Sequence, residues 1–220
     1  TTQLGGGYVS NGVSGTSFSS PITAGVAALV WAMHPDWTPD QVAMQIRATA
    51  DNLKVPSGAY APFFHKRVNA YRAVNLNKTF TGSALATMPG VELTGYTING
   101  KATDTLKGRE QTATVQLRLK NLLAPTRNLK IASIVGQVLT TDGDITLPKL
   151  GTLEETAQEI TVRFAPNAQV LYSEGNIPLI LLLSDGAYEA YVKVEIPISI
   201  PGWKKQFDPP TAQFEGSSIK

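Results

Sequence analysis

The stretch Gly15-Thr16-Ser17-Phe18-Ser19-Ser20-Pro21 runs directly into the small and apolar residues Ile22-Thr23-Ala24-Gly25-Val26-Ala27-Ala28-Leu29-Val30. It predicts a turn of small residues that ends in a serine at the start of a helix. Pro21 fits this prediction, because the N–H groups of a first helical turn lack acceptors within the helix and a residue without an N–H is tolerated there. Ser17 is therefore a candidate nucleophile at a helix N-terminus.

A serine hydroxyl needs a neighbouring base to accept its proton, and the oxyanion that forms needs hydrogen-bond donors already in place. The backbone N–H of Ser17 can supply one donor, supported by the positive end of the helix dipole. The chain has two histidines. His34 lies about 25 Å from Ser17 along the same predicted helix, at 1.5 Å per residue, so it fits a helix end better than a base. His65, beside Lys66 in a predicted loop, is interpreted as a surface residue.

Three aspartates near this segment suit structural positions rather than the orientation of a catalytic histidine. We expect a turn, a first helical turn and a helix end for Asp36, Asp40 and Asp51. On the residues alone, neither a base for Ser17 nor an aspartate that orients such a base is therefore identified.

Three segments resemble the subtilisin-like serine proteases, peptidase family S8. Gly15 to Gly25 matches the family's Gly-Thr-Ser-x-Ser/Ala-x-Pro signature and the small residues after it. His34-Pro35-Asp36-Trp37-Thr38 resembles the family's His-Pro-x-Trp-Thr segment. Lys66 to Val74 resembles its closing Gly-x-Val-Asn-Ala helix, although His65-Lys66 stands where the family usually has glycines. The resemblance covers about residues 1–76.

The resemblance implies that Ser17 is the catalytic nucleophile and that Gly15 and Thr16 support its turn. In this family the triad runs Asp, His, Ser along the chain, so the aspartate and histidine would precede this sequence. The fragment alone would then be inactive, and the missing N-terminal part of its own catalytic domain would be its partner. A protein or peptide substrate and an extracellular or cell-surface location are also implied. No cofactor is expected on this chain, and the resemblance associates calcium binding with the intact family domain.

The helical pattern extends over about residues 17–75. Its first helix, Ser19 to Met33, is apolar nearly all round and needs cover on every side, which an eighty-residue segment cannot give. Thr38-Pro39-Asp40-Gln41 predicts a capping box with proline at the first helical position, opening an amphipathic surface helix. Its apolar face is expected to carry Val42, Ile46, Ala50 and Leu53, and Arg67 to Val74 predicts a short last helix.

The rest of the chain changes to strand patterning, for example the alternation of Ala113, Val115, Leu117 and Leu119 with polar residues. Further strands are predicted at 91–98, 129–135, 160–164, 177–183 and 188–196. Turn pairs separate these runs, and Asp185-Gly186 predicts a hairpin. The predicted fold class is therefore an α/β fragment followed by an all-β, immunoglobulin-like sandwich. We expect a peptidase part over 1–80, the sandwich over 88–200 and a linker or tail over 201–220.

Other classes of function fit less well. A formal charge of +2 without a basic stripe argues against nucleic acid, and no apolar run reaches the roughly 18 residues of a membrane span. The absence of cysteine excludes disulfides and thiolate metal sites. Asp142-Gly143-Asp144 is interpreted as a plain turn rather than a calcium site. A set of aromatic residues is expected to pack in the core: Trp31, Trp37, Phe63, Phe64 and Tyr71.

Three hypotheses remain at this point. The first is a subtilisin-type serine endopeptidase in the intact protein, which cleaves peptide bonds through an acyl-enzyme on Ser17. The second is an adhesive or carbohydrate-binding β-sandwich attached to a vestigial protease. The third is one piece of a nicked protease whose N-terminal piece stays associated.

Overall fold

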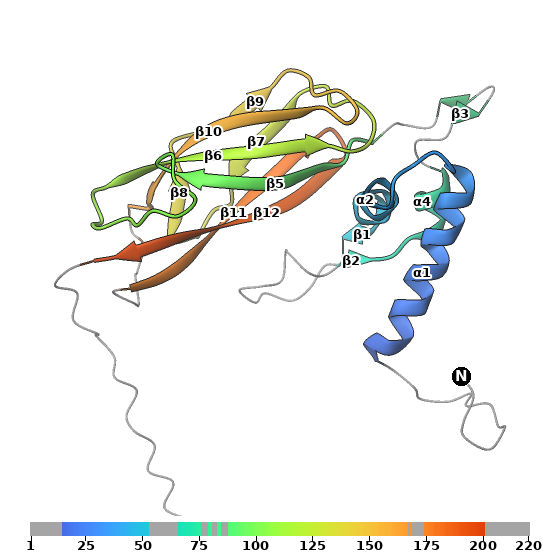
Figure 1. The fold of residues 1–220 in the computed structure, drawn as a ribbon, viewed down its shortest axis with the longest axis horizontal. Helices are drawn as coiled ribbons and strands as arrows, with labels where there is room; N and C mark the ends of the chain where they lie inside the picture. The colour runs from blue at the N-terminus through green and yellow to red at the C-terminus, as the bar shows by residue number, and fades with distance from the viewer. Residues whose placement is uncertain are drawn as a thin grey trace, which may run out of the picture. The chain divides into compact units, whose positions relative to one another are not determined.

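The computed structural model describes most of the chain, shown in Figure 1. It describes residues 15–52, 66–75, 79–80, 83–84, 88–166, 168 and 174–200. The predicted loop at 56–62, His65 and the predicted tail at 201–220 lie outside the described residues. The chain divides into two compact units. Unit 1 comprises residues 1–90 together with 121–126 and 151–154, and unit 2 comprises the remaining three stretches, 91–120, 127–150 and 155–220.

The described residues of unit 1 contain three helices: α1 (Thr16–Met33), α2 (Pro39–Thr49) and α4 (Ala70–Asn75). The capping box predicted for α2 is present. Thr38 Oγ1 accepts from the backbone N–H of Gln41 at 3.3 Å, and Gln41 Oε1 accepts from that of Thr38 at 3.0 Å. Pro39 follows as the first helical residue, so the local signal fixes where α2 begins.

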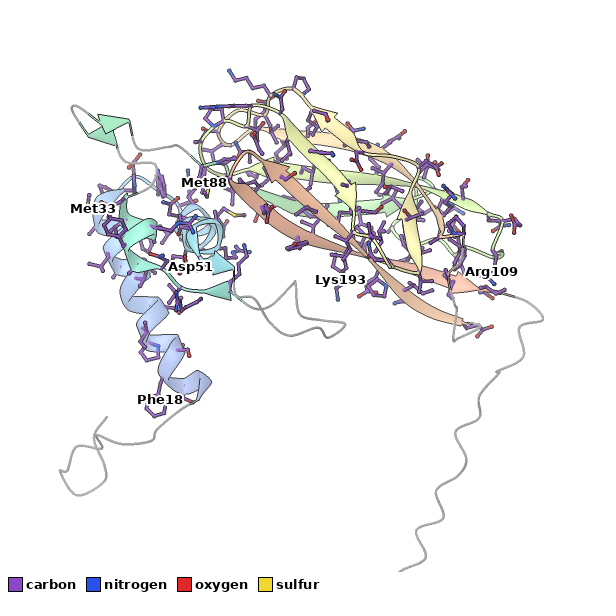
Figure 2. All side chains as sticks on the ribbon, turned by 180° about the vertical axis from the view of Figure 1, so that it is seen from behind. Phe18, Met33, Asp51, Met88, Arg109 and Lys193 are labelled. Carbon is purple, nitrogen blue, oxygen red and sulfur yellow. The ribbon has the colours of Figure 1, made fainter. Side chains whose placement is uncertain are left out.

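The three helices share a small core of Val26 and Val30 from α1, Val42 from α2 and Ala73 from α4. Val30 and Ala73 are fully buried. The other sides of α1 are not covered within the described residues, because Ile22 is 60% and Leu29 55% exposed. Figure 2 labels Phe18 and Met33 near opposite ends of this helix.

Two sequence expectations for unit 1 need correction. The helix predicted at Arg67 to Val74 begins only at Ala70, because Lys66–Arg67 form the short strand β2, which pairs with β1 (Asp51–Asn52). The helix α2 is also more than a surface helix. It ends at Thr49, and five of its residues are buried: Gln41, Val42, Met44, Gln45 and Thr49. Leu53 lies outside the described residues. Unit 1 further contains the paired two-residue strands β3 (Thr79–Phe80) and β4 (Ser83–Ala84).

Unit 2 holds two four-stranded sheets with antiparallel pairing, in the orders β5-β6-β10-β8 and β12-β11-β7-β9. Figure 1 shows them as two layers, with β5 and β6 over β11 and β12. The first sheet consists of β5 (Val91–Ile98), β6 (Thr112–Asn121), β10 (Glu155–Phe164) and β8 (Leu139–Thr141). The second consists of β12 (Tyr188–Ser199), β11 (Glu174–Asp185), β7 (Leu129–Ser133) and β9 (Ile145–Leu147).

Alternation along β6 sets the inner face of the first sheet. Ala113, Val115, Leu117 and Leu119 are all at most 1% exposed, and they are the residues that the sequence pattern placed on one side. Leu179, Leu181 and Leu183 do the same for β11 in the second sheet. The described part of the chain therefore consists of a small helical unit and a larger β unit. The immunoglobulin-like class remains a prediction.

The turns follow local sequence. Asn99 and Gly100 both have positive φ, 49° and 75°, and they join the bridged residues Ile98 and Lys101. This is the backbone that two-residue hairpin turns require, which explains the Asn-Gly pair. Gly186, with φ of 61°, turns the chain between β11 and β12. Asp142 and Gly143 lie between β8 and β9, two three-residue strands that the sequence pattern did not predict.

Candidate active site

Ser17 is the second residue of α1, and it is exposed. Gly15 precedes the helix with φ 157° and ψ 160°, a conformation that residues with a side chain rarely adopt. The Phe18 N–H donates to the Gly15 carbonyl at 3.1 Å. The glycine thus permits the sharp entry into α1 that leaves Ser17 at the helix start. The Thr16 side chain is not described.

Pro21 lies one helical turn further into α1 than the sequence predicts. The helix begins at Thr16, so Pro21 is its sixth residue and stands in the second turn. A proline there cannot donate to the carbonyl four residues earlier, which is that of Ser17. The Thr23 hydroxyl donates to the neighbouring Ser19 carbonyl at 3.0 Å. Backbone hydrogen bonding is therefore reduced at the turn that carries the candidate nucleophile.

His34 ends α1 at the opposite end from Ser17. Its backbone N–H donates to the carbonyls of Val30 and Trp31, at 3.1 and 3.2 Å, as a helix C-cap does. Its ring stacks on Trp37, with the ring centroids 3.8 Å apart and the planes inclined by 9°. The expected helix-end position is confirmed, and His34 cannot serve as a base for Ser17. His65 lies outside the described residues, so the described part brings no histidine to Ser17.

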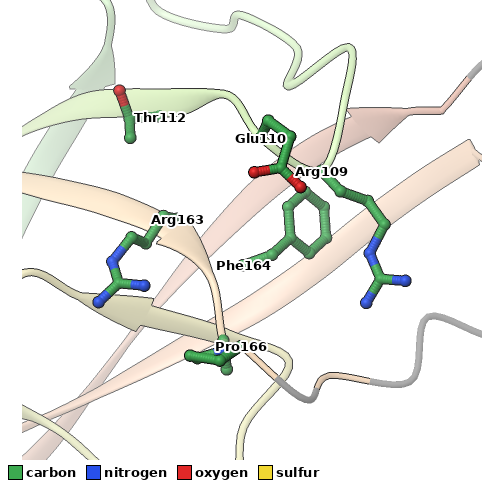
Figure 3. Close-up of a pocket in the computed structure, with 7 residues that line it drawn as sticks. Arg109, Glu110, Thr112, Arg163, Phe164 and Pro166 are labelled. Atoms are coloured by element: carbon green, nitrogen blue, oxygen red, sulfur yellow. The ribbon is translucent and has the colours of Figure 1, made fainter.

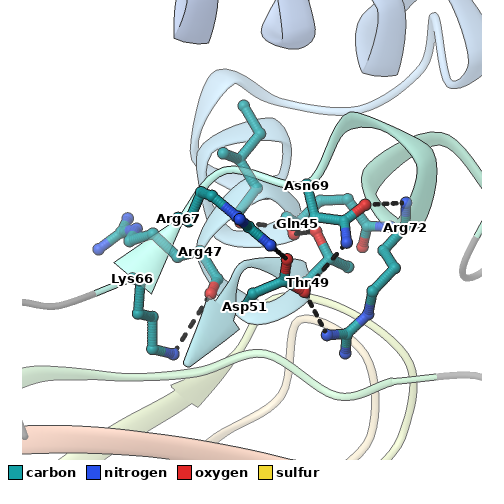
Figure 4. A network of polar contacts seen from close by, with 9 residues as sticks. Gln45, Arg47, Thr49, Asp51, Lys66, Arg67, Asn69 and Arg72 are labelled. Carbon is teal, nitrogen blue, oxygen red and sulfur yellow. Dashed lines mark hydrogen bonds and ion pairs between the residues drawn. The ribbon is translucent and has the colours of Figure 1, made fainter. Parts of the chain in front are cut away.

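A polar network that the sequence did not predict is centred on Asp51 (Figure 4). Asp51 accepts from Arg67 at 3.1 Å, from Asn69 at 3.0 Å and from Arg72 at 3.4 Å. Asn69 also caps α4, because its Oδ1 accepts from the backbone N–H of Arg72 at 2.9 Å. The network joins strand β1, strand β2 and the start of α4. It lowers the pKa of Asp51, first through the Asn69 hydrogen bond and then through that of Arg67.

A signal for this network was present in the sequence, because Asn69 lies between Arg67 and Arg72. The partner carboxylate could not be identified, because Asp51 lies 16 to 21 residues away from them. Asp51, which the sequence predicts at a helix end, instead begins the short strand β1, two residues beyond the last residue of α2. Asp40 occupies the first turn of α2 and Asp36 a turn, as expected.

An apolar groove of about 670 Å³ runs between α1 and α2. Ala24, Ala27 and Trp31 line it from α1, and Val42 and Ile46 from α2. Trp31 remains 43% exposed, which corrects the expectation that it packs in the core. Tyr71 is likewise 75% exposed, whereas Trp37 packs against buried clusters. Phe63 and Phe64 lie outside the described residues.

Unit 2 has a polar hollow of about 510 Å³ at the start of β6 and the end of β10 (Figure 3). Its two guanidinium groups are engaged within the chain, because Arg109 donates to the Ala168 carbonyl and Arg163 pairs with Asp142. Asp144 pairs with Lys130 at 2.6 Å. Both carboxylates of the Asp142-Gly143-Asp144 segment thus form ion pairs with basic side chains of the same chain, which is consistent with a plain turn. The described residues contain no group of three side chains suited to a metal ion.

No helix within the described residues is long and apolar enough to cross a membrane.

Comparison with known proteins identifies relatives of the N-terminal part of the chain. A family model described as the subtilase family matches residues 2–79. A probable subtilase-type serine protease of Deinococcus radiodurans is 45% identical over 56 residues, 23% of this chain and 8% of that protein. A thermostable alkaline protease of Halalkalibacterium halodurans is 46% identical over 57 residues, 26% of this chain and 15% of that protein.

A subtilisin-like protease of Arabidopsis thaliana is 29% identical over 155 residues, 65% of this chain and 20% of that protein. That match is longer than the segment covered by the family model, so it includes residues beyond 79. The chain matches at most about a fifth of the length of these curated relatives. The helical segment of unit 1, with Ser17 at the start of α1, lies within the residues that the family model matches. Residues 2–79 of this chain are thus a subtilisin-like segment, as the match to the subtilase family model indicates.

Proposed function

We propose that the intact protein is a subtilisin-type serine endopeptidase and that Ser17 is its nucleophile. The observation that carries the proposal is the position of Ser17. It lies exposed in the first turn of α1, behind a glycine in a glycine-type conformation, within the segment that matches the subtilase family. Gly15 and Thr16 support the turn. An N-cap role for Ser17 is less consistent with this geometry, because the residue at the cap position is Gly15.

In the proposed reaction, Ser17 Oγ attacks the carbonyl carbon of the scissile peptide bond while a histidine accepts the hydroxyl proton. The carbonyl oxygen becomes an oxyanion, to which the Ser17 backbone N–H donates from the helix N-terminus. The C–N bond then breaks, and the histidine returns the proton to the leaving amine. Water, deprotonated by the same histidine, attacks the acyl-enzyme and releases the acid and Ser17.

The histidine and its aspartate are proposed to come from a part of the catalytic domain that precedes this sequence. His34 is too far along α1 to act on Ser17, and the described residues bring no other histidine to it. The fragment alone is therefore proposed to be inactive. The same preceding part would cover the exposed apolar side chains of α1, which include Ile22, Leu29 and Trp31.

The substrate class that follows is a protein or peptide, and the family favours an exported protein. Specificity for particular side chains would depend on residues outside this sequence. The alternative, a surface-binding β unit with a vestigial protease, gains no support from the polar hollow of unit 2, because both arginines there have partners in the chain.

A serine-directed phosphonate probe tests the proposal on the full-length protein. We expect covalent labelling that disappears in Ser17→Ala and persists in Ser20→Ala, a matched control because Ser20 is exposed on the same helix. The 220-residue chain alone is expected to remain unlabelled. Labelling of full-length Ser17→Ala at the wild-type level would overturn the assignment.

A further inference from the structure

The helix α2 is buried on two sides, although its sequence predicts a single apolar face. One side, with Val42, packs on α1 and α4. The other side presents Gln41, Met44 and Ala48, which are spaced at three and four residues and so share a face. Met44 packs with Leu122 and Leu123 in a second buried cluster, with Trp37 and Ala48 against it. All of these residues belong to unit 1.

The surface that receives this second side is here called the α2 seat, and it comprises residues 88–90 and 121–124. The seat is closely fitted. A Cβ atom on Gly90 would lie 2.7 Å from Leu123 Cδ1 and closer still to Met44 Cγ, so a larger residue there would force both side chains to move. Met88 is also buried, at 6% exposure.

Hydrogen bonds order the α2 seat from within. The fully buried Asn121 accepts from the Gly90 N–H at 3.0 Å and donates to the carbonyls of Ala124, at 2.9 Å, and Gly151, at 3.1 Å. The Leu122 N–H donates to the Gly90 carbonyl at 2.8 Å. Buried polar groups that are satisfied in this way favour one defined arrangement of the segments.

Gln41 connects α2 to this arrangement. Its Oε1 completes the capping box, and its Nε2 donates to the Leu122 carbonyl at 3.0 Å in a buried contact across 81 residues of sequence. The side chain of Gln41 therefore forms hydrogen bonds both at the start of α2 and with the α2 seat. A free surface helix would need only the first of these contacts.

We propose that the α2 seat is an intramolecular interaction surface whose partner is the second side of α2, and that it stabilises the subtilase segment. The folding unit of that segment then extends beyond residue 79, where the family match ends, and includes residues 88–90 and 121–124. Through Val42, Val26 and Val30, the seat also supports the helix that carries Ser17. The proposal rests on packing alone and is independent of whether Ser17 is a nucleophile.

Hydrogen exchange of the full 220-residue chain provides the first test. Leu123→Ala is expected to speed exchange of the α2 amides at least tenfold. Two control variants are expected to leave α2 unchanged: Leu153→Ala, at a side chain of unit 1 that is 51% exposed, and Leu139→Ala, at a fully buried side chain of unit 2. Unchanged α2 exchange in Leu123→Ala would overturn the proposal.

A cross-link decides the case in which Leu123→Ala fails to fold. Met44 and Leu123 both approach within 3 Å of the same point above Gly90, and the chain has no cysteine of its own. Met44→Cys/Leu123→Cys is expected to form a disulfide under mild oxidation at least ten times faster than Ala43→Cys/Leu123→Cys, since Ala43 is exposed on α2. Equal rates in the two pairs would refute packing of α2 on its seat.

Discussion

Two adjacent residues of α1 make a matched test of how this helix is covered. Val30 is fully buried in the core of unit 1, whereas Leu29 is 55% exposed. Leu29→Ala removes more carbon atoms than Val30→Ala. We nevertheless expect Val30→Ala to lower the free energy of unfolding of the 220-residue chain by the larger amount.

The magnitudes follow from burial. Val30→Ala removes two buried methyl groups at about 0.8 kcal/mol each, and the cavity adds to this loss. The better helix propensity of alanine returns about 0.5 kcal/mol, which leaves a net cost of about 1.5–2 kcal/mol. Leu29→Ala removes a side chain that is less than half buried, for a cost of about 1 kcal/mol or less. In the intact protein, where a covering part of the catalytic domain is proposed, the same change should cost about 2–4 kcal/mol.

Urea denaturation followed by tryptophan fluorescence measures this difference. Of the three tryptophans, Trp31 and Trp37 belong to unit 1, and a Trp203→Phe background leaves these two as the reporters. A dilution series guards against self-association through the exposed apolar face. If Leu29→Ala destabilised the monomeric chain as much as Val30→Ala, α1 would already be covered in this chain. An unchanged Leu29→Ala cost in the intact protein would refute the proposed cover.

Two further predictions concern polar contacts. Because the folded-state pKa of Asp51 is lowered, its network stabilises unit 1 at pH values above the ordinary aspartate pKa of about 3.9, and this stabilisation is lost as the pH falls through the lower folded value. Asp51→Asn should remove that part of the acid dependence of the unfolding free energy, measured by urea titrations at several pH values. An identical pH profile in the variant would contradict the assignment. In unit 2, the Tyr188 hydroxyl accepts from the Val91 N–H at 2.8 Å and donates to the Val91 carbonyl at 3.0 Å. Tyr188→Phe leaves the buried N–H and carbonyl of Val91 without this partner and should lower the free energy of unfolding by about 1–3 kcal/mol, measured by circular dichroism in urea. The control Tyr191→Phe, at a partly exposed side chain, should lower it less. Equal losses in the two variants would count against the hydrogen bonds of Tyr188.

The parts of the fold that local sequence determines were predictable. The alternation in β6 and the Asp-Gly turn between β11 and β12 each depend on residues close in sequence. The strands β8 and β9 were missed because three residues are too few to show alternation. The start of α4 was placed too early because Lys66 and Arg67 pair with Asp51 and Asn52, a tertiary contact that overrides helical pattern.

The candidate site divides in the same way. Gly15 and Ser17 are recognisable because the glycine conformation and the helix start occur within three residues. The contacts that support the helices are not local. Asp51 meets Arg72 across 21 residues, and Gln41 meets Leu122 across 81. Sequence patterning assigned Gln41 only its capping role, because nothing near it in the chain indicates a second partner.

The helix that carries Ser17 depends on support from two sources. Val26 and Val30 face α2 and α4, and α2 in turn rests on its seat through Met44. Other α1 side chains, among them Leu29, are exposed and are proposed to meet the preceding part of the catalytic domain. Because these contacts use different residues of α1, loss of the seat and loss of the cover should destabilise the helix by separate amounts that add. If the intact protein has the proposed peptidase activity, a weakened seat should leave that activity unchanged at low temperature and cause its loss at a lower temperature than in the wild type.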